Sequence, residues 1–464
     1  MPRAAARRHA PTAILLAAAC GLAGCSLVPT YERPSVPTQG EWSTPPSAAS
    51  TGVPVTADWW QQFASPELDT LMAEALAANQ DLAAAIGRID QARATTRIAG
   101  APLLPNVEAT GSVSGTRTRA NQRTRNSSSG DALLTANYEI DLWGKNAAGL
   151  EAAEHTLTAT AFDKEALALV VQSEVASTYF DAVSLKQRLA IARENLAAAR
   201  QVLKLVEIQI AQGASTALAL AQQRTAVATF EAQIPTLEQQ LEADQSSLAI
   251  LLGRAPGNTV VERDKLDNLT LPEIAAGQPA DLLGRRPDIA EAEANLKSAN
   301  ANIGVARAAF YPSLTLSASA AISGLATSGT SAAAALAAGL VAPIFEGGQL
   351  EGQLDLAKGR KRELVATYRQ TVLTSFKEAE DALSTVATSA ARVRSLQTAA
   401  DQAREAFRLA QLSYSAGASD FLTVLDAQRT LLDNEDSLVQ AQRDRFTAAA
   451  GLFKALGGGW AGGT

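Results

Sequence analysis

Few residues of this sequence are of the types that carry covalent or metal chemistry. The two cysteines, Cys20 and Cys25, lie near the N-terminus, and the 464 residues contain only two histidines. Gly347 and Gly348 form a glycine pair, but the Lys and Ser/Thr of a phosphate-binding loop are not at the required spacing. The sequence offers no nucleophile–base pair and no cluster of metal ligands, so we expect no catalytic residue, no metal site and no cofactor.

The chemistry that the spacing does favour is acylation of one thiol. Three arginines open the sequence and precede an apolar run, which ends in Leu22-Ala23-Gly24-Cys25. This layout predicts a secretory signal peptide at residues 1–24. A cysteine at the cut resembles the bacterial lipobox, in which the thiol is diacylated and Cys25 becomes the first residue. An ordinary signal peptide with an incidental cysteine is the alternative.

The chain that remains after cleavage contains few reactive side chains. It would keep one cysteine and one histidine, His155, and loss of the three arginines would lower the net charge from −7 to −10. The net acidic charge of this chain argues against a nucleic-acid partner. No apolar stretch after the signal is long enough for a transmembrane helix, so a membrane-spanning part would have to consist of strands. Residues 25–57, rich in Pro, Ser and Thr, are predicted to be a lipidated tether.

The sequence contains an internal duplication. Four landmarks recur in the same order at offsets of 204 to 207 residues. They pair Asp81 with Asp288, Pro105 with Pro312, Gly213-Ala214-Ser215 with Gly417-Ala418-Ser419, and Gln223-Arg224-Thr225 with Gln428-Arg429-Thr430. We predict two repeats at 58–253 and 287–456, joined by an equatorial connector at 254–286 and followed by a flexible tail at 457–464.

Each repeat begins with a helix that a proline ends, and a segment with period two follows. In the first repeat this predicts a β-hairpin near 105–142 with a polar loop at 117–131. Its return strand places Leu134 and Ala136 on one face and Thr135 and Asn137 on the other. A second hairpin is predicted near 313–344, where the alanine-rich return strand alternates poorly and is inferred from the duplication.

Alternation of this length has two interpretations. Transmembrane barrel strands turn apolar residues to lipid and polar residues to water, and a half-exposed soluble sheet has the same pattern. The predicted lipid anchor favours the membrane. Four strands cannot close a barrel, and an open edge in lipid leaves backbone groups unpaired. Several chains would therefore have to share one barrel, with eight strands from two chains or twelve from three.

Long helices follow each hairpin. Residues 150–212 and 360–416 contain neither Gly nor Pro over 63 and 57 positions. We predict helices at 145–212 and 349–416, each on the order of 100 Å long, with return helices at 216–253 and 419–456. A seven-residue apolar spacing predicts antiparallel coiled-coil hairpins. The positions are Leu189, Leu196, Leu203 and Ile210, then Leu220, Val227, Ile234, Leu241 and Leu248, and finally Leu425, Leu432, Val439, Phe446 and Phe453.

Several motifs together resemble one family over nearly the whole mature chain. They are Trp59-Trp60 with Phe63 and Leu68, Tyr138-Glu139-Ile140-Asp141-Leu142-Trp143-Gly144, Leu283-Gly284-Arg285-Arg286-Pro287-Asp288, Phe310-Tyr311-Pro312, Phe345-Glu346-Gly347-Gly348, and Leu425-Asp426-Ala427-Gln428 after Gly417. The chain is similar to the TolC/OprM outer membrane factors, in the NodT-like lipoprotein branch of efflux system outer membrane subunits.

This resemblance implies a mixed α and β membrane protein. Its expected form is a homotrimer with a twelve-stranded β-barrel, four strands per chain, continued by a long α-helical barrel of coiled-coil hairpins. It implies an outer-membrane position, an anchor at Cys25 and passive export of drugs, toxic compounds or metal ions in a tripartite system. The implied partners are outer-membrane lipid, a periplasmic adaptor (membrane fusion) protein and an inner-membrane pump, with the proton-driven RND type favoured over an ATP-driven exporter.

The resemblance also assigns roles to residues. The tip residues Gly213, Ala214, Ser215, Gly417, Ala418 and Ser419 would face the adaptor, or would only form tight turns. Asp426 matches an acidic position that narrows the periplasmic aperture, and Tyr414 matches a gating tyrosine; a solvated helix carboxylate is the alternative for Asp426. The first repeat has Ala221 or Gln222 at the equivalent place, so a trimer would hold three acids at the aperture. Like charges at close range raise each other's pKa and attract cations.

Two other functions compete with a passive duct. An enzyme attached to the outer membrane would need the reactive groups that the inventory lacks. A structural lipoprotein that ties envelope layers together would need only helices, so the hairpins with a polar face count against it.

Overall fold

The computed structural model describes residues 26–37, 40–43, 52–120, 122–257, 259–324 and 329–460. The predicted signal segment 1–24, Cys25 and residues 461–464 of the predicted tail lie outside the described residues. The chain divides into two compact units. The first consists of the described parts of Met1–Ser35, Gly87–Ala161 and Glu291–Gln370, and the second of those of Val36–Ile86, Phe162–Ala290 and Thr371–Thr464.

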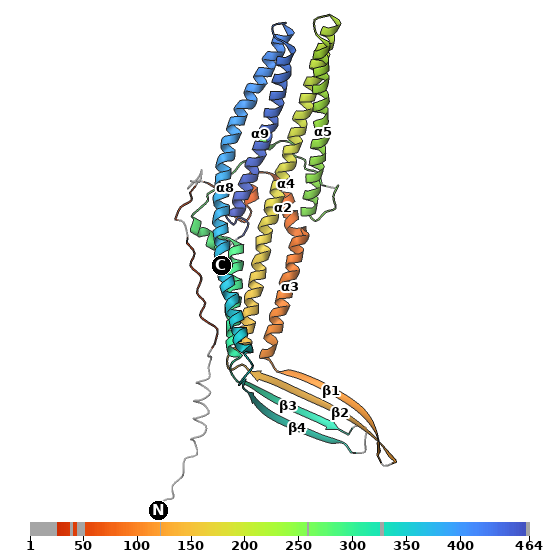
Figure 1. The fold of residues 1–464 in the computed structure, drawn as a ribbon, viewed down its shortest axis with the longest axis vertical. Coiled ribbons are helices and arrows are strands. Elements are labelled where there is room, and N and C mark those ends of the chain that lie inside the picture. Colours follow the sequence, from red (N-terminus) through yellow and green to blue (C-terminus); the bar gives the residue numbers. More distant parts are fainter. Residues whose placement is uncertain are drawn as a thin grey trace, which may run out of the picture. The chain divides into compact units, whose positions relative to one another are not determined.

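The order of elements repeats once along the chain (Figure 1). The first copy contains η1 (Trp59–Phe63), α2 (Pro66–Ala78), α3 (Gln80–Gly100), η2 (Ala101–Leu103), β1 (Asn106–Ala120), β2 (Arg123–Ile140), α4 (Lys145–Ala211) and α5 (Ala217–Leu251). The short helices η3 (Leu266–Asn268) and η4 (Pro279–Asp281) lie between the copies. The second copy contains α6 (Leu282–Arg285), α7 (Pro287–Ala308), β3 (Ser313–Ser323), β4 (Ser331–Val341), α8 (Gln349–Ser415) and α9 (Phe421–Ala455). Because α4 and α8 both have 67 residues, and α5 and α9 both have 35, the structure confirms the duplication.

The strands form one antiparallel sheet in the order β1-β2-β3-β4. The predicted polar loop at 117–131 is wrong, because both strands of the first hairpin continue through it to the pair Ala120↔Arg123. Between the paired residues Ala120 and Arg123, Gln122 has a positive φ of 63°. Polar residues stand on both faces of this segment, so it lacks apolar alternation, yet a run of Ser, Thr and Arg is compatible with strand backbone.

The sheet register places the apolar residues of all four strands on one face. One row joins Ala109, Leu134, Ala320 and Ala334, and the next row on that face joins Val107, Ala136, Ala318 and Leu336. Directly opposed residues of antiparallel strands share a face. The intervening rows are mainly polar, as in the row of Glu108, Thr135, Ser319 and Ala335. The alternation seen in single strands therefore builds one apolar surface across the whole sheet.

An aromatic cluster forms part of the core of the second unit. The Trp59 ring stacks on Phe453 with centroids 5.1 Å apart, and Phe63 lies 5.0 Å from Phe180. Phe180 also lies 5.3 Å from Phe446. Aromatic contacts of this kind stabilise a core beyond the area that they bury. The cluster fixes η1 between α4 and α9.

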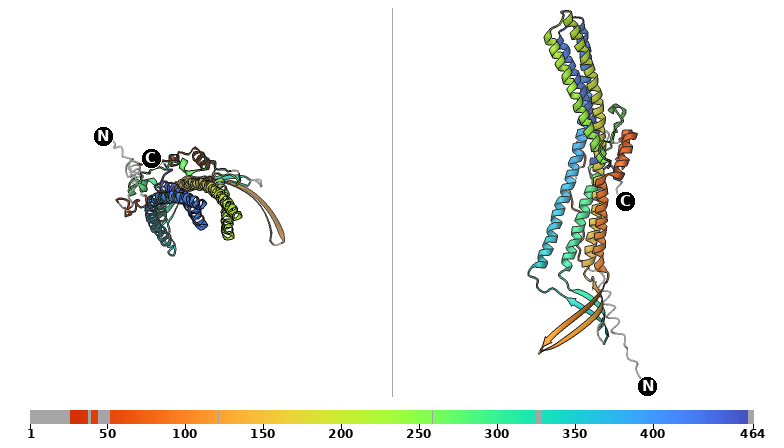
Figure 2. Two further views of the ribbon diagram at one scale, coloured as in Figure 1. Left: turned by 90° about the horizontal axis from the view of Figure 1, so that it is seen from above. Right: turned by 90° about the vertical axis from the view of Figure 1, so that its right-hand side faces the viewer.

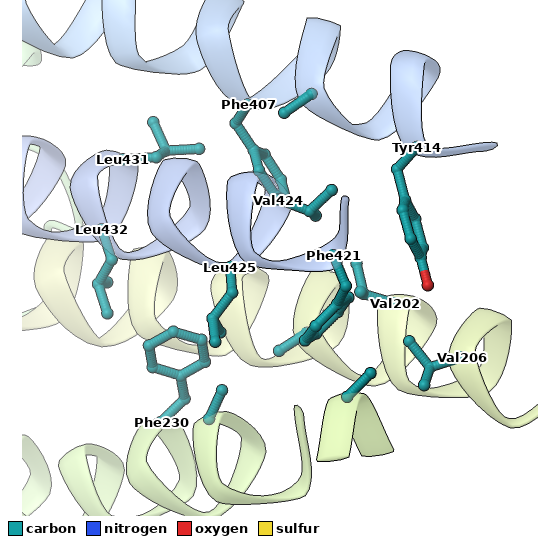
Figure 3. Close-up of a cluster of buried hydrophobic side chains, with 14 of the residues drawn as sticks. Val202, Val206, Phe230, Phe407, Tyr414, Phe421, Val424, Leu425, Leu431 and Leu432 are labelled. Atoms are coloured by element: carbon teal, nitrogen blue, oxygen red, sulfur yellow. The ribbon is translucent and has the colours of Figure 1, made fainter. Parts of the chain in front are cut away.

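Two helical hairpins, α4 with α5 and α8 with α9, lie side by side (Figures 1 and 2). One buried cluster takes side chains from all four helices, including Val202, Phe230, Phe407 and Leu432 (Figure 3). All five seven-residue positions of α9 are buried, whereas in α5 only Leu248 is buried and the other four are half-buried. The cause is position, since α9 has an ion-paired neighbour on each side, α8 and α4.

Candidate functional site

Each helical hairpin turns at a tip with the same backbone geometry. Gly213 and Gly417 both have a φ of +73°, a conformation that favours glycine. The N–H of Ala214 donates to the carbonyl of Gln209, and the N–H of Gly213 donates to that of Ile210. The second tip repeats both bonds at positions 418 and 417. This Schellman pattern satisfies carbonyl groups that the end of a helix leaves unpaired.

The return helices start with a cap directly after each tip. The Thr216 hydroxyl accepts a hydrogen bond from the Ala219 N–H at 3.2 Å, and the Asp420 carboxylate accepts one from the Thr423 N–H at 2.9 Å. The Thr423 hydroxyl also donates to Asp420 at 2.6 Å, and this hydrogen bond, followed by that of the Thr423 backbone N–H, lowers the pKa of Asp420. Glycine, small residues and a capping side chain thus give two compact, exposed turns.

Exposed apolar side chains flank both tips at equivalent positions. Ile208 and Leu412 are 46% and 54% exposed, and Leu218 and Leu422 are 67% and 58% exposed. Each pair is offset by 204 residues, as are the tips themselves. Sequence reasoning missed these four residues because they lie outside the seven-residue spacing. The signal that could have found them is the recurrence of an apolar residue where coiled-coil packing does not require one.

Tyr414 and Asp426, the two residues predicted at the aperture, have different surroundings. Tyr414 is 8% exposed, its ring lies 5.8 Å from that of Phe421, and its hydroxyl donates to the Gln209 side chain of α4 (Figure 3). It therefore links the two helical hairpins. Asp426 is exposed on α9, and among the described residues its carboxylate has no hydrogen-bond or ion-pair partner. The structure does not bring the two side chains into contact.

Ion pairs join neighbouring helices below the tips. Arg188 of α4 holds Asp436 of α9 through two hydrogen bonds of 2.6 and 3.2 Å. Arg404 of α8 pairs with Glu435 at 2.7 Å, and this hydrogen bond raises the pKa of Arg404. Bidentate pairs such as Arg188–Asp436 are geometrically specific. Together, the Arg188–Asp436 and Arg404–Glu435 pairs hold α9 against α4 and α8.

The N-terminal segment of the first unit follows helix α7. The carbonyls of Leu27 and Pro29 accept hydrogen bonds from Arg307 at 3.3 Å and Asn300 at 2.6 Å, and Arg33 pairs with Glu293 at 2.6 Å. Before this run, the Cα of Ser26 lies 3.9 Å from where a Cβ at position 144 would stand. Residue 26, which follows the predicted acylation site, thus lies where β2 passes into α4.

The described residues contain no helix that is both long and apolar enough to cross a membrane. They also contain no group of three or more His, Cys, Asp or Glu side chains arranged to hold a metal ion.

The model of the outer membrane efflux protein family matches residues 71–254 and 279–458. The chain belongs to this family. It is 40% identical to the pyoverdine export outer membrane protein OpmQ of Pseudomonas aeruginosa, over 97% of this chain and 96% of that protein. It is 33% identical to the probable efflux pump outer membrane protein TtgC of Pseudomonas putida, over 95% of this chain and 93% of that protein.

Solved structures agree with this family assignment. The open state of the Neisseria gonorrhoeae MtrE outer membrane channel matches with a TM-score of 0.84 and 30% identity, covering 94% of this chain and 98% of that one. The efflux protein is therefore an outer-membrane channel component of an export system, with the predicted mixed architecture of a strand sheet and long helical hairpins. The resemblance found in the sequence is confirmed.

Proposed function

We propose that three copies of this efflux protein close their sheets into one twelve-stranded barrel, through which small molecules leave the cell passively. The observation that carries the proposal is the sheet register, which gives one face apolar rows and the other mainly polar rows. Such a sheet suits lipid on one side and water on the other. No chemical step is needed, and the driving force comes from the pump.

The edges of the sheet are the reason for a closed oligomer. Strands β1 and β4 are the edge strands of the described sheet. In lipid their free N–H and C=O groups would each cost several kcal/mol if unpaired. Pairing β1 of one chain with β4 of the next removes both edges, and three chains supply twelve strands.

Conductance of single channels tests the duct. The purified protein in planar bilayers should conduct as a trimer. Asp426→Ala should increase conductance or reduce preference for cations, because a ring of exposed carboxylates at the aperture attracts cations. Trimers that never conduct, with or without the substitution, would refute the duct.

The proposed lipid anchor is Cys25. Its support is the position of Ser26 at Gly144, beside the end of the strand sheet. An acyl chain attached one residue earlier would enter the membrane where the sheet does. Cys25→Ser should abolish labelling by a radioactive fatty acid, and labelling that persists would overturn the anchor.

The two tips are the proposed docking surface for a periplasmic adaptor. Exposed apolar residues beside a tight turn suit the packing of a partner's helices. Gly417→Leu should therefore weaken crosslinking to the adaptor while the trimer persists. Gly257→Leu is a matched control, because Gly257 also has a positive φ (+96°) and open space around it. Equal crosslinking in both variants would contradict docking at the tips.

The proposed cargo follows the relatives. The two relatives at 40% identity are named for pyoverdine export, whereas those at 33–34% include antibiotic and solvent efflux proteins. We therefore propose a secreted siderophore as the main cargo, ahead of antibiotics and solvents. Deletion of the gene should retain the siderophore in the periplasm, and unchanged secretion with raised antibiotic sensitivity would reverse this order. The proposed pump is of the proton-driven RND type, so an uncoupler should stop export in cells with normal ATP.

A further inference from the structure

The end of the β1–β2 hairpin carries an unbalanced positive charge. Residues 109–130 contain four arginines, Arg117, Arg119, Arg123 and Arg125, and no acidic residue. All four are exposed, and none has an ion pair or side-chain hydrogen bond within the described part of the chain. The hairpin projects beyond the rest of the sheet, because pairing of β2 with β3 stops at Asp131↔Ser323 (Figure 1).

The register places two of these arginines on each face. Along β1, the apolar face presents Val107, Ala109, Gly111, Val113 and Gly115, and the next two residues on that face are Arg117 and Arg119. Arg123 and Arg125 stand opposite Ala120 and Thr118, on the polar face. Beyond Val113 and one row of small residues, Gly115 and Ser128, this face therefore carries a pair of guanidinium groups.

The length of the apolar surface fits the thickness of a membrane. From Ile140 to Gly130, strand β2 advances ten residues, or about 34 Å at ~3.4 Å per residue. With a strand tilt of about 40°, this spans about 26 Å, close to the ~25 Å apolar band of outer-membrane barrels. Arg117 and Arg119 lie four and six residues past the Val113↔Gly130 row, which is about 10 and 16 Å further along the membrane normal at the same tilt. Their long side chains extend back toward the lipid headgroups.

The two ends of the band differ in their anchoring residues. Near the helices, Trp143 packs on Tyr311 with ring centroids 4.7 Å apart, and its indole N–H donates to the Pro312 carbonyl at 2.8 Å. Aromatic residues of this kind usually line both membrane interfaces. Tyr138, also near the helices, is the only aromatic residue in β1–β4, so the hairpin end has none. There, arginines occupy the interface.

We propose that Arg117 and Arg119 bind the phosphate groups of the phosphorylated glycolipid in the outer leaflet of the outer membrane. A guanidinium group donates two parallel hydrogen bonds to a phosphate, and its planar fork suits this geometry better than an ammonium group does. A pair of arginines two residues apart on one strand face presents such forks about 7 Å apart. Arg123 and Arg125, on the water-facing side, do not take part.

The inference rests on the proposed barrel, because the arginines reach headgroups only if the sheet crosses the membrane. Its test uses the whole purified channel in detergent, titrated with bisphosphorylated lipid A and followed by native mass spectrometry. The first double variant, Arg117→Gln with Arg119→Gln, changes the two arginines on the apolar face of the sheet, which would be the outer face of the barrel. We call it the outer-face variant. The matched control, Arg123→Gln with Arg125→Gln, removes the same charge from the same hairpin.

We expect the outer-face variant to bind lipid A at least about 10-fold more weakly than the unsubstituted protein, and the control to stay within about 2-fold. Monophosphorylated lipid A should bind more weakly than the bisphosphorylated form, and millimolar inorganic phosphate should not displace it. Equal loss in both variants, no loss in the outer-face variant, or displacement by free phosphate would overturn the proposal. Conductance of the same samples tests the barrel independently, since an intact channel conducts whether or not it binds lipid A. Samples that conduct but do not bind lipid A would contradict the lipid proposal alone.

Discussion

Arg286 joins the start of the second repeat to the end of α9. It is 8% exposed, and its guanidinium donates to Asp288 at 3.0 and 2.8 Å, to Glu378 at 2.7 Å and to the Ala455 carbonyl at 3.0 Å. Burial opposes its charge, but Asp288 and Glu378 outweigh that effect and raise its pKa. One side chain thus connects α7, α8 and the last turn of α9. We predict that Arg286→Ala destabilises this connection.

The size of the effect follows from the exposure of the partners. A hydrogen bond to a charged group contributes about 1.5–3 kcal/mol when buried. The carboxylates of Asp288 and Glu378 are 34% and 45% exposed, so water recovers much of that loss and each ion pair counts for about 1 kcal/mol. The Ala455 carbonyl left without a donor adds about 1 kcal/mol. The total is about 3 kcal/mol, which lowers the melting temperature of a chain of this size by roughly 3 °C.

The neighbouring residue provides a control. Arg285 is exposed, and its nearest carboxylate, Asp281, is 3.9 Å away with both side chains in solvent. Arg285→Ala should therefore shift the melting temperature by less than about 1 °C. Arg286→Lys should recover part of the loss, because an ammonium group replaces the fork by a point charge. Differential scanning fluorimetry of the purified channel measures all three variants, and equal shifts at 285 and 286 would refute the reasoning.

Three further predictions concern the second unit. Burial, and then the charge of Asp181, raise the pKa of Asp244 to about 6. Its ionisation therefore destabilises the folded state as the pH rises from about 4 through 6, and Asp244→Asn should raise the melting temperature at pH 7.5 but not at pH 4.5. Leu218→Ser with Leu422→Ser should weaken adaptor binding at least about 10-fold in biolayer interferometry, because burying each leucine contributes about 1–2 kcal/mol. Phe453→Ala, which leaves a cavity in the aromatic cluster, should cost about 3–5 kcal/mol in denaturant unfolding.

Each of these predictions has a contrary outcome. For Asp244→Asn, the contrary outcome is a change in melting temperature that is the same at pH 4.5 and pH 7.5. Glu242→Gln, at an exposed neighbouring position, is the control. For the tip leucines it is an equal loss of adaptor binding in Ile250→Ser, since Ile250 is 64% exposed on α5 but distant along the helix from the tip. For Phe453 it is an unfolding midpoint unchanged by the substitution.

The elements that follow from local periodicity could be read from the sequence. Long stretches without Gly or Pro predicted α4 and α8, and the glycines with φ of +73° marked both turns. The strands of residues 117–131 were missed because polar residues occupy both faces there, so the apolar alternation that predicts a strand is absent. The alanine-rich strand β4 has little alternation of its own, so only the duplication indicated it.

The surroundings of single side chains could not be read in this way. The family resemblance identified Tyr414 as a candidate aperture residue. The burial of its ring against Phe421 and its hydrogen bond to Gln209, however, depend on how the two helical hairpins pack. The pair Arg188–Asp436 joins residues 248 positions apart. Charged residues are frequent on both helices, and only the relative rotation of the helices selects which of them meet.

The long helices and the return helices have the same lengths in both repeats, whereas the ends of the elements differ, and packing explains why. α4 lies along α9, and α9 along α8, so an insertion in one helix would shift its seven-residue register against the neighbours and break pairs such as Arg188–Asp436. No such constraint acts at the ends of the elements. There the first repeat has a hairpin with strands of 15 and 18 residues bearing four arginines, against 11 and 11 in the second. The second repeat alone carries an acid, Asp426, in the first turns of its return helix, where the first has Ala221 or Gln222. Two of these differences, the arginines of the first hairpin and Asp426, lie where contacts with lipid and cargo are proposed, whereas the proposed adaptor contacts use tips that both repeats share.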